Sequence, residues 1–552
     1  MENSKKQAID LFNNKNYKKS LSIFLSILKK EPKSIDILMF ATYNCMQLQN
    51  YKEALVYLEK IIQINKKLPH VYYNIAVCFG ILGETQEAIK NFKKAISLKK
   101  DYFESYVQLG QLLKKQNLFN DAISIYKTAL QKVIQKDYIN VNMSELYYLK
   151  KNYQQSKKYA EDALKLNPKL YFAHINIANC LIDEGEIGSA IIELEKAKII
   201  NSVYPMIFNN LGFCHKILGN DEEAITSYKK AIKLNPNLHD AYFNLSHIQL
   251  SNNNFIDGWK NYEYRWGTQK KFTKRLIFNK PQWNTNMGFE RILIWGEQGI
   301  GEQLLFSSIL QDTLTHFKKV IVFVEDKLVE LFQKKFSEIQ IYPISKKIDE
   351  SEFDYHLPIC SLAKVFRKDI FSFPSKNLDD PINMNNKIIT KRKLKCAISW
   401  KSTHQNLGNI KSIGLEDLKD ILFIDDIDFF DIQYTNEDKE IKNFKKKYGV
   451  SIHQNENLDT FNDLLGLSDF INECDFVITV SNTNAHLSAS MGKPTFLLLP
   501  KTRGKFWYWE NDLNGKNLWY PSIVKFKQSD QGDWSKPIGS LKNFLFQRYY
   551  LN

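Results

Sequence analysis

The segment that decides the fold of the N-terminal half is AITSYKKAIKLNP, residues 224–236, because its pattern returns along the chain every 34 residues. Steps of 34 through Ala224 meet a small residue each time, at Ser20, Ala54, Ala88, Ala122, Ser156, Ala190, Ala224 and Gly258. Twelve residues earlier lies a second series of small residues or Thr, at Ala8, Thr42, Ala76, Gly110, Ser144, Ala178, Gly212 and Ser246. This register runs without insertion from residue 1 to about 267 and predicts about eight stacked units.

Each unit reads as a pair of antiparallel helices. Small residues allow two helices to cross closely, and a large residue four positions after most members of the first series fills the neighbouring gap, as at Phe92, Tyr126 and Tyr228. Prolines recur at the same position of the repeat, at Pro32, Pro168 and Pro236, where each would end the second helix of its unit. The N-terminal half is therefore expected to be an all-α solenoid.

This pattern closely resembles the tetratricopeptide repeat family. The resemblance implies a curved array whose concave face holds an extended peptide or a protein segment. The repeat array could instead serve as a structural spacer or an oligomerisation arm, because no residue pattern in the repeats identifies a ligand.

Composition excludes several classes of protein. Of 552 residues, 44% are hydrophobic and 25% charged, which is ordinary for globular domains and excludes wholesale disorder. The net charge is +15, yet 69 of the 76 cations are Lys, and the first 264 residues contain no Arg, the residue suited to reading phosphates and bases. We therefore expect no nucleic-acid partner.

The seven cysteines show no CxxC spacing, which favours free thiols in a reducing compartment. No apolar run approaches the length of a membrane helix, and the polar N-terminus lacks the core of a signal peptide. A cytoplasmic protein without an integral membrane segment is the expectation.

After about residue 268 the pattern changes to short apolar runs that alternate with helical stretches. Strands are predicted at 291–295, 320–325, 394–400, 429–434, 476–480 and 495–499. Such alternation favours an α/β fold with parallel sheets covered on both faces, here two sheets with a break near Pro374–Asn386. The predicted divisions are a repeat array at 1–267, a junction at 268–288, and two lobes at 289–385 and 386–552.

Ligands of α/β proteins bind at the carboxyl ends of strands, and the first loop to consider is a glycine turn, WGEQGIGEQLL, residues 295–305. It offers the free backbone N–H groups of a helix start near Gly299 and Gly301. It is no P-loop, and Leu304 stands where a dinucleotide fingerprint needs its third glycine. A turn that only packs helix against strand is an equal alternative.

Two further loops follow later strands. Lys401 and Ser402 follow the strand at 394–400, and a lysine at the carboxyl end of a strand can bind a phosphate, although a solvated lysine is the plain alternative. Asn482 and Thr483 follow the strand at 476–480, before a helix expected to begin near His486. His486 in isolation reads better as a packed histidine than as a ligand.

Together the three loops resemble bacterial glycosyltransferases of the glycosyltransferase-B fold, in particular the heptosyltransferase-like, glycosyltransferase family 9-like group. The resemblance covers about residues 255–535 and includes the tail segments KFWYW, residues 505–509, and LWYPS, residues 518–522. Repeats followed by a two-lobed transferase are also similar to the O-linked N-acetylglucosamine transferases. The implied fold is a tetratricopeptide solenoid followed by a two-lobed, double Rossmann-like domain.

The resemblance also implies a reaction. A nucleotide-diphosphate sugar would bind mainly to the C-terminal lobe without metal or other cofactor, and its sugar would pass to an acceptor hydroxyl. Lys401, Ser402 and the helix start at Asn482, Thr483 and His486 would hold the donor with Gly299 and Gly301. Glu302 would be the catalytic base that deprotonates the acceptor. The repeats would bind a protein partner or the acceptor.

Two positions depart from the family pattern. Glu302 stands where Asp is common, and Ser481-Asn482 stands where many relatives have Asp-Thr. A non-catalytic scaffold with a degenerate transferase domain is therefore the alternative function, and a nucleotide-sugar sensor is a third. The Asp-x-Asp at Asp426–Asp428 precedes its strand, so we read it as a solvated turn and expect no metal site there.

Overall fold

The computed structural model describes residues 2–268, 275–373, 392–403 and 407–549. The chain divides into two compact units, Met1–Ile207 and Phe208–Asn552, and the division falls inside helix α13. The repeat pattern thus runs past the end of the first unit, and its last helices pack within the second. The predicted break near Pro374–Asn386, including the boundary at 385, lies outside the described residues.

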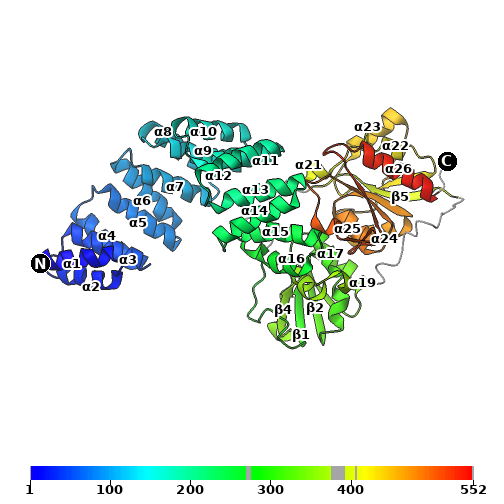
Figure 1. Cartoon of the computed structure of the whole chain (residues 1–552). Helices are drawn as coiled ribbons and strands as arrows, with labels where there is room; N and C mark the ends of the chain where they lie inside the picture. The colour runs from blue at the N-terminus through cyan, green and yellow to red at the C-terminus, as the bar shows by residue number, and fades with distance from the viewer. Residues whose placement is uncertain (1, 269–274, 374–391, 404–406, 550–552) are drawn as a thin grey trace. The chain divides into compact units, whose positions relative to one another are not determined.

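Sixteen helices occupy the repeat region (Figure 1). They are α1 (Glu2–Asn13), α2 (Tyr17–Leu28), α3 (Ile35–Gln47), α4 (Tyr51–Ile64), α5 (Pro69–Leu82), α6 (Thr85–Leu98), α7 (Phe103–Lys115), α8 (Phe119–Lys132), α9 (Lys136–Leu149), α10 (Tyr153–Leu166), α11 (Tyr171–Glu184), α12 (Ile187–Ile200), α13 (Pro205–Leu218), α14 (Asp221–Leu234), α15 (His239–Ser251) and α16 (Phe255–Tyr262). The 34-residue period therefore corresponds to one helix pair, as predicted.

The packing explains the period. Ala54, Ala88 and Ala122 are fully buried, as expected for small residues between closely packed helices. A Cβ on Gly212 would lie 2.8 Å from the Tyr228 ring, and one on Gly110 would overlap Tyr126. A ring sixteen residues later fills the space that the missing side chain leaves, which confirms the predicted exchange of small and large residues.

Two parallel sheets follow the repeats. The first has the order β3-β2-β1-β4, and the second β11-β8-β7-β5-β6. Their strands are β1 (Arg291–Trp295), β2 (Lys319–Val324), β3 (Gln340–Pro343), β4 (Tyr355–Pro358), β5 (Leu394–Ser399), β6 (Ile427–Asp431), β7 (Phe476–Val480), β8 (Thr495–Leu499) and β11 (Ile523–Lys527), beside an antiparallel pair, β9 (Asp512–Leu513) and β10 (Lys516–Asn517). Parallel pairing with helices between the strands confirms the predicted α/β class.

The helices of this part are α17 (Ile300–Ser307), α18 (Leu310–Leu314), α19 (Val329–Lys335), α20 (Ala363–Phe366), α21 (Gly408–Lys411), α22 (Lys419–Leu422), α23 (Asp438–Tyr448), α24 (Leu464–Glu473), α25 (Thr483–Ser490) and α26 (Ser535–Tyr549). One hydrophobic cluster joins Trp259 of α16, Leu305 of α17 and Trp519 near the C-terminus. The last repeat helices are therefore part of the core of the second unit.

Two predicted boundaries were wrong. The strand predicted at 429–434 is β6, Ile427–Asp431, because the Asp431 carboxylate accepts a 2.7 Å hydrogen bond from the Gln433 N–H and turns the chain there. The helix expected to begin near His486 begins at Thr483, because the Asn482 side chain caps it by accepting from the Ala485 N–H. In the described part of the chain, no helix is long and apolar enough to cross a membrane.

Candidate functional site

The predicted site residues lie in loops that leave the carboxyl ends of the two sheets. The glycine turn joins β1 to α17, Lys401 and Ser402 follow β5, and Asn482 links β7 to α25. Parallel strands direct their carboxyl ends to one edge of a sheet, so each sheet contributes its loops on a single side.

Glu302 lies in the first turn of α17, three residues after the capping residue Gly299. Burial raises the pKa of the Glu302 carboxyl, and hydrogen bonds from its own N–H and that of Gly299, with the charge of Lys411, partly oppose the rise. A glutamate at this position that reaches back to the capping N–H is one half of a capping box. Glu302 is thus a helix cap as well as a candidate base.

A buried ion pair between Arg265 and Glu297 stabilises the start of the glycine turn. Arg265, just after α16, donates from Nε and Nη2 to both carboxylate oxygens of Glu297 at 2.9 and 2.6 Å. Its Nη2 also donates to Ser361, and both charged side chains are almost fully buried. The last repeat helix therefore fixes the strand end that carries the turn.

Lys401 and Ser402 line a cavity of about 430 Å³ at the carboxyl ends of β5 and β6, together with Thr403, Asn409, Ser412, Ile413, Gly414, Thr435 and Glu437. The Lys401 ammonium forms a 3.0 Å ion pair with Glu440, which also accepts from the Trp400 indole. Lys401 is therefore at the cavity, but its charge already has a partner.

Lys411 ends α21 and is only 4% exposed. Its ammonium lies 4.9 Å from the centre of the Phe506 ring, and the structure gives Nζ no hydrogen bond or ion pair with a described residue. Burial lowers the pKa of Lys411 to about 8, and the Glu302 charge opposes that shift. A buried cation that forms no ion pair with any described residue is a candidate for binding an anion.

Asn482 uses its side chain to join β5, β7 and α25. Its Nδ2 donates to Ser399 Oγ at 3.0 Å and to the Lys401 carbonyl at 3.1 Å. Its Oδ1 accepts from Thr479 and from the Ala485 N–H. All its hydrogen-bonding capacity is engaged, so we expect Asn482 to position a donor site rather than touch the donor. Thr483, half-buried, is the first residue of α25.

His486 lies against the glycine turn. A Cβ on Gly301 would lie 2.8 Å from His486 Cδ2 and 3.2 Å from Nε2, so only glycine allows α17 and α25 to approach this closely. His486 Nδ1 is hydrogen-bonded to the Tyr520 hydroxyl at 3.0 Å. Burial, followed by the charge of Lys411, lowers the pKa of His486 to about 3, so the ring is neutral near pH 7.

The structure thus brings together Glu302, Lys411 and His486, one group from the first sheet and two from the second. Tyr508 and Trp509 pack on the His486 ring at 5.0 and 4.7 Å. Lys401 and Ser402 lie toward the cavity instead. Sequence reasoning missed Lys411 as a site residue because it is one of 69 lysines, and only its burial distinguishes it.

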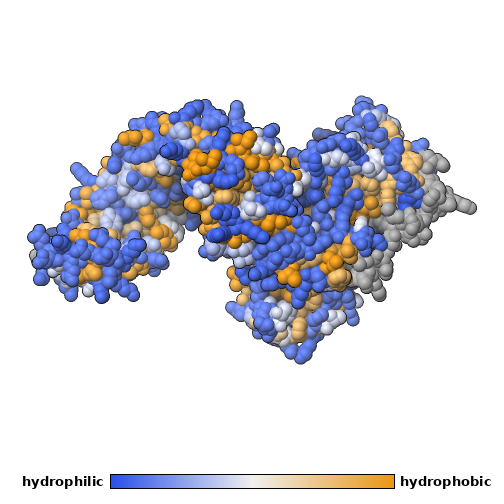
Figure 2. Space-filling view, in the orientation of Figure 1, coloured by the Kyte–Doolittle hydropathy of each residue, from blue (hydrophilic) through white to orange (hydrophobic). Residues whose placement is uncertain are grey.

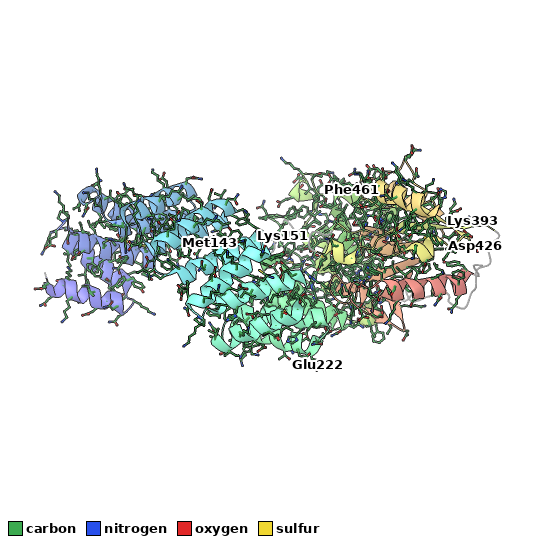
Figure 3. The ribbon with its side chains drawn as sticks, turned by 90° about the horizontal axis from the view of Figure 1, so that it is seen from above. Met143, Lys151, Glu222, Lys393, Asp426 and Phe461 are labelled. Carbon is green, nitrogen blue, oxygen red and sulfur yellow. The ribbon has the colours of Figure 1, made fainter. Side chains whose placement is uncertain are left out.

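Asp426 lies just before β6, at the opposite end of the second sheet, but the prediction that Asp428 also precedes the strand was wrong, because β6 begins at Ile427 and Asp428 pairs with Lys395 of β5. Figure 3 shows Asp426 near Lys393, which precedes β5, and the Leu394 N–H donates to the Asp426 carbonyl at 2.8 Å. These are the amino ends of two neighbouring parallel strands, as the sequence indicated.

Comparison with known proteins identifies the repeats. A TPR repeat model matches residues 81–117 and 214–253, and a tetratricopeptide repeat model matches residues 138–170. With the helix pairs described above, the N-terminal part is a solenoid of tetratricopeptide repeats, an architecture typical of protein interaction.

Among curated relatives, Protein FlbA of Caulobacter vibrioides is 22% identical over 530 residues, which cover 91% of this chain and 88% of FlbA. Human Protein O-mannosyl-transferase TMTC3 is 27% identical over 265 residues, which cover 43% of this chain but 28% of TMTC3. A crystal structure of the C-terminal part of a TPR repeat-containing protein from Cytophaga hutchinsonii is 18% identical and covers 44% of this chain and 99% of that one, with a TM-score of 0.35.

Proposed function

We propose that this chain is a glycosyltransferase that moves a sugar from a nucleotide-diphosphate sugar to an acceptor hydroxyl, while the repeats bind a protein partner or the acceptor. The observation that carries the proposal is the convergence of Glu302, Lys411 and His486 where two parallel sheets meet. The proposed fold of this part is of the glycosyltransferase-B type, in which two such lobes enclose the donor.

The donor would bind on the side of the second sheet. Lys411 and the start of α25 offer a buried cation and the N-terminal end of a helix to a diphosphate. The 430 Å³ cavity lies within the size range of small-ligand sites and would take the nucleoside, with Lys401 and Ser402 in its wall. The same positive groups would stabilise the negative charge that develops on the departing nucleotide.

The acceptor would bind on the side of the first sheet. Its oxygen attacks the anomeric carbon, the bond from that carbon to the diphosphate oxygen breaks with its electron pair on the diphosphate, and the hydroxyl proton passes to Glu302. A carboxylate whose pKa is raised by burial takes a proton more readily near neutral pH than an exposed one. Neutral His486 and the aromatic rings around it would exclude water.

A calorimetric titration with a panel of nucleotide-diphosphate sugars tests the donor site. We expect one donor to bind the full chain, and we expect Lys411→Ala to weaken that donor at least tenfold, because the cation is lost. Lys395→Ala is the matched control, since Lys395 is exposed near the amino end of β5. Loss of binding in both variants, or in neither, would contradict the assignment.

Turnover tests the base. Release of nucleoside diphosphate from the same donor, with water or a protein fraction as acceptor, should fall at least 100-fold in Glu302→Gln while donor affinity is kept.

A protein-binding scaffold with a degenerate transferase part is the second candidate. It is favoured by the hydrogen bond from Gly299 to Glu302 and by the Lys401–Glu440 ion pair, which give two expected site residues structural roles. Failure of every donor to bind the full chain would favour this function.

A further inference from the structure

The last helices of the repeat array hold two basic side chains in contact. Lys216 lies in the last turn of α13, and His247 lies in α15, the first helix of the next repeat; both are half-buried. The Lys216 ammonium lies 3.3 Å from His247 Nδ1. Because an ammonium can only donate, His247 Nδ1 accepts this hydrogen bond, and Lys216 keeps two further N–H donors.

The repeat register offers a second lysine for comparison with Lys216. Three repeats earlier, 102 residues before, the same two positions hold Lys114 of α7 and Glu145 of α9. Lys114 donates to both carboxylate oxygens of Glu145 at 2.8 Å. The two pairs occupy the same places in their repeats, but in the later pair an imidazole stands where the earlier pair has a carboxylate.

The charge of Lys216 is therefore not balanced by a carboxylate in contact with it. The structure gives Lys216 Nζ no ion pair with any residue that it describes. Burial lowers the pKa of Lys216 to about 8, and the charge of Asp221, which accepts a 3.3 Å hydrogen bond from Asn252, partly opposes that shift. Burial, followed by the Lys216 charge, holds the pKa of His247 well below its usual value, so the imidazole is neutral near pH 7. A bound anion would supply the missing counter-charge.

The basic pair lies beside the candidate site. The centre of the His247 ring is 6.2 Å from that of Tyr262 in α16. The Tyr262 hydroxyl accepts a 2.8 Å hydrogen bond from Gln298 of the glycine turn. Burial, followed by charged neighbours that include Glu302, raises the pKa of Tyr262. One aromatic side chain therefore connects the basic pair to the turn that carries the proposed base.

We propose that Lys216, held in place by His247, binds a carboxylate of the acceptor, and that the acceptor is an acidic segment of a protein. The carboxylate takes the place beside Lys216 that Glu145 has beside Lys114. A protein segment suits tetratricopeptide repeats, whose architecture is typical of protein interaction, and Figure 2 shows hydrophilic and apolar side chains mixed over the visible surface of the repeat helices. The assignment to an acceptor rests on the proposed transfer function, whereas the anion site itself does not.

Nuclear magnetic resonance of the full chain, labelled with carbon-13 at histidine Cε1, tests the site without any sugar donor. The His247 signal is the one lost in His247→Gln. We expect a capped Ser-Glu-Thr peptide to shift this signal saturably at constant ionic strength, and its Ser-Gln-Thr counterpart to leave it unchanged. Binding should weaken at least tenfold in Lys216→Met, because the charge is lost. Lys114→Met is the matched control, since Lys114 has the same register position but its own carboxylate partner.

If Lys216→Met failed to fold, Lys216→Gln should show the same loss, and Lys216→Arg, which keeps the charge, should keep the response. A His247 signal that does not distinguish the two peptides, or that responds equally in Lys216→Met, would overturn the proposal. Saturation by inorganic phosphate but not by the glutamate peptide would overturn the carboxylate in favour of a phosphate-bearing acceptor. Sugar-donor affinity should be unchanged in Lys216→Met, so failure of the unmodified chain to bind any donor would contradict the transfer function and not the anion site.

Discussion

Helices α17 and α25 each follow a buried parallel strand, α17 after the turn at 296–299 and α25 after residues 481–482, but their first turns are built differently. Asn482 caps α25 with a side chain that is bonded on every side to β5, β7 and the helix itself. Gly299 caps α17 without a side chain, and Glu302 reaches back to it. The start of α25 is therefore fixed by a cap that has no other proposed role, whereas at the start of α17 the capping residue Glu302 is also the proposed base.

The largest predicted difference between the two helix starts is in how much each capping residue stabilises the fold. Asn482→Ala removes four hydrogen bonds from a buried network and leaves partners unsatisfied, so the free energy of unfolding should fall by about 3 kcal/mol. Glu302→Ala removes only half of a helix cap, and about 1 kcal/mol is expected. Urea denaturation of both variants measures the contrast, and equal losses would contradict the different roles of the two caps.

The buried cation between the two helix starts should make stability depend on pH. Because burial lowers the Lys411 pKa from 10.5 to about 8, the unfolded chain holds a proton between these values that the folded chain has released. The titration of Lys411 therefore raises the free energy of unfolding as pH rises from about 8 to 10.5. Below pH 8, the folded protein carries the full destabilisation of a buried, charged ammonium.

Lys411→Met should therefore stabilise the chain at pH 7 by about 2 kcal/mol more than at pH 10. Urea denaturation of both proteins at the two pH values gives this difference directly. Lys395→Met, at an exposed lysine, should show no such pH dependence, and a flat difference for Lys411→Met would mean that its ammonium is well solvated.

The smallest effect should come from the contact between the two helices. A Cβ on Gly301 would press on His486, so Gly301→Ala should lower the free energy of unfolding by about 1–2 kcal/mol. In the His486→Ala background the same substitution should cost less, and a double-mutant cycle measures that coupling. Gly188→Ala in α12, where a Cβ would meet nothing within 4 Å, should be neutral or slightly stabilising. Purely additive effects of Gly301 and His486 would show that the two helices do not depend on this contact.

The sequence was informative about the fold where a pattern was long or strongly apolar. The 34-residue register predicted the helix pairs, and β1, β7 and β8 lie where their apolar runs predicted them. Strands β3 and β4 were missed because each has four residues and ends in proline. Strand β11 was missed because Lys525 and Lys527 interrupt its apolar run, as suits the edge of a sheet.

The candidate site was only partly predictable. The glycine turn and the polar loop after β7 indicated Glu302 and His486, because helix starts after buried strands are local patterns. No local pattern separates Lys411 from Lys401, since both are lysines that follow β5 and precede β6. Their difference arises from distant residues: Glu440 pairs with Lys401, whereas Phe506 and Glu302 surround Lys411.

Hydrogen–deuterium exchange of the full chain, with and without a saturating nucleotide-diphosphate sugar chosen from the panel, tests the central claim most directly. We predict that the donor slows exchange at the backbone amides of residues 409–414 and at the start of α25 around Thr483, and leaves residues 1–207 unchanged. Protection confined to the repeats, or none with any donor, would contradict the claim that Lys411 and the start of α25 form the donor site.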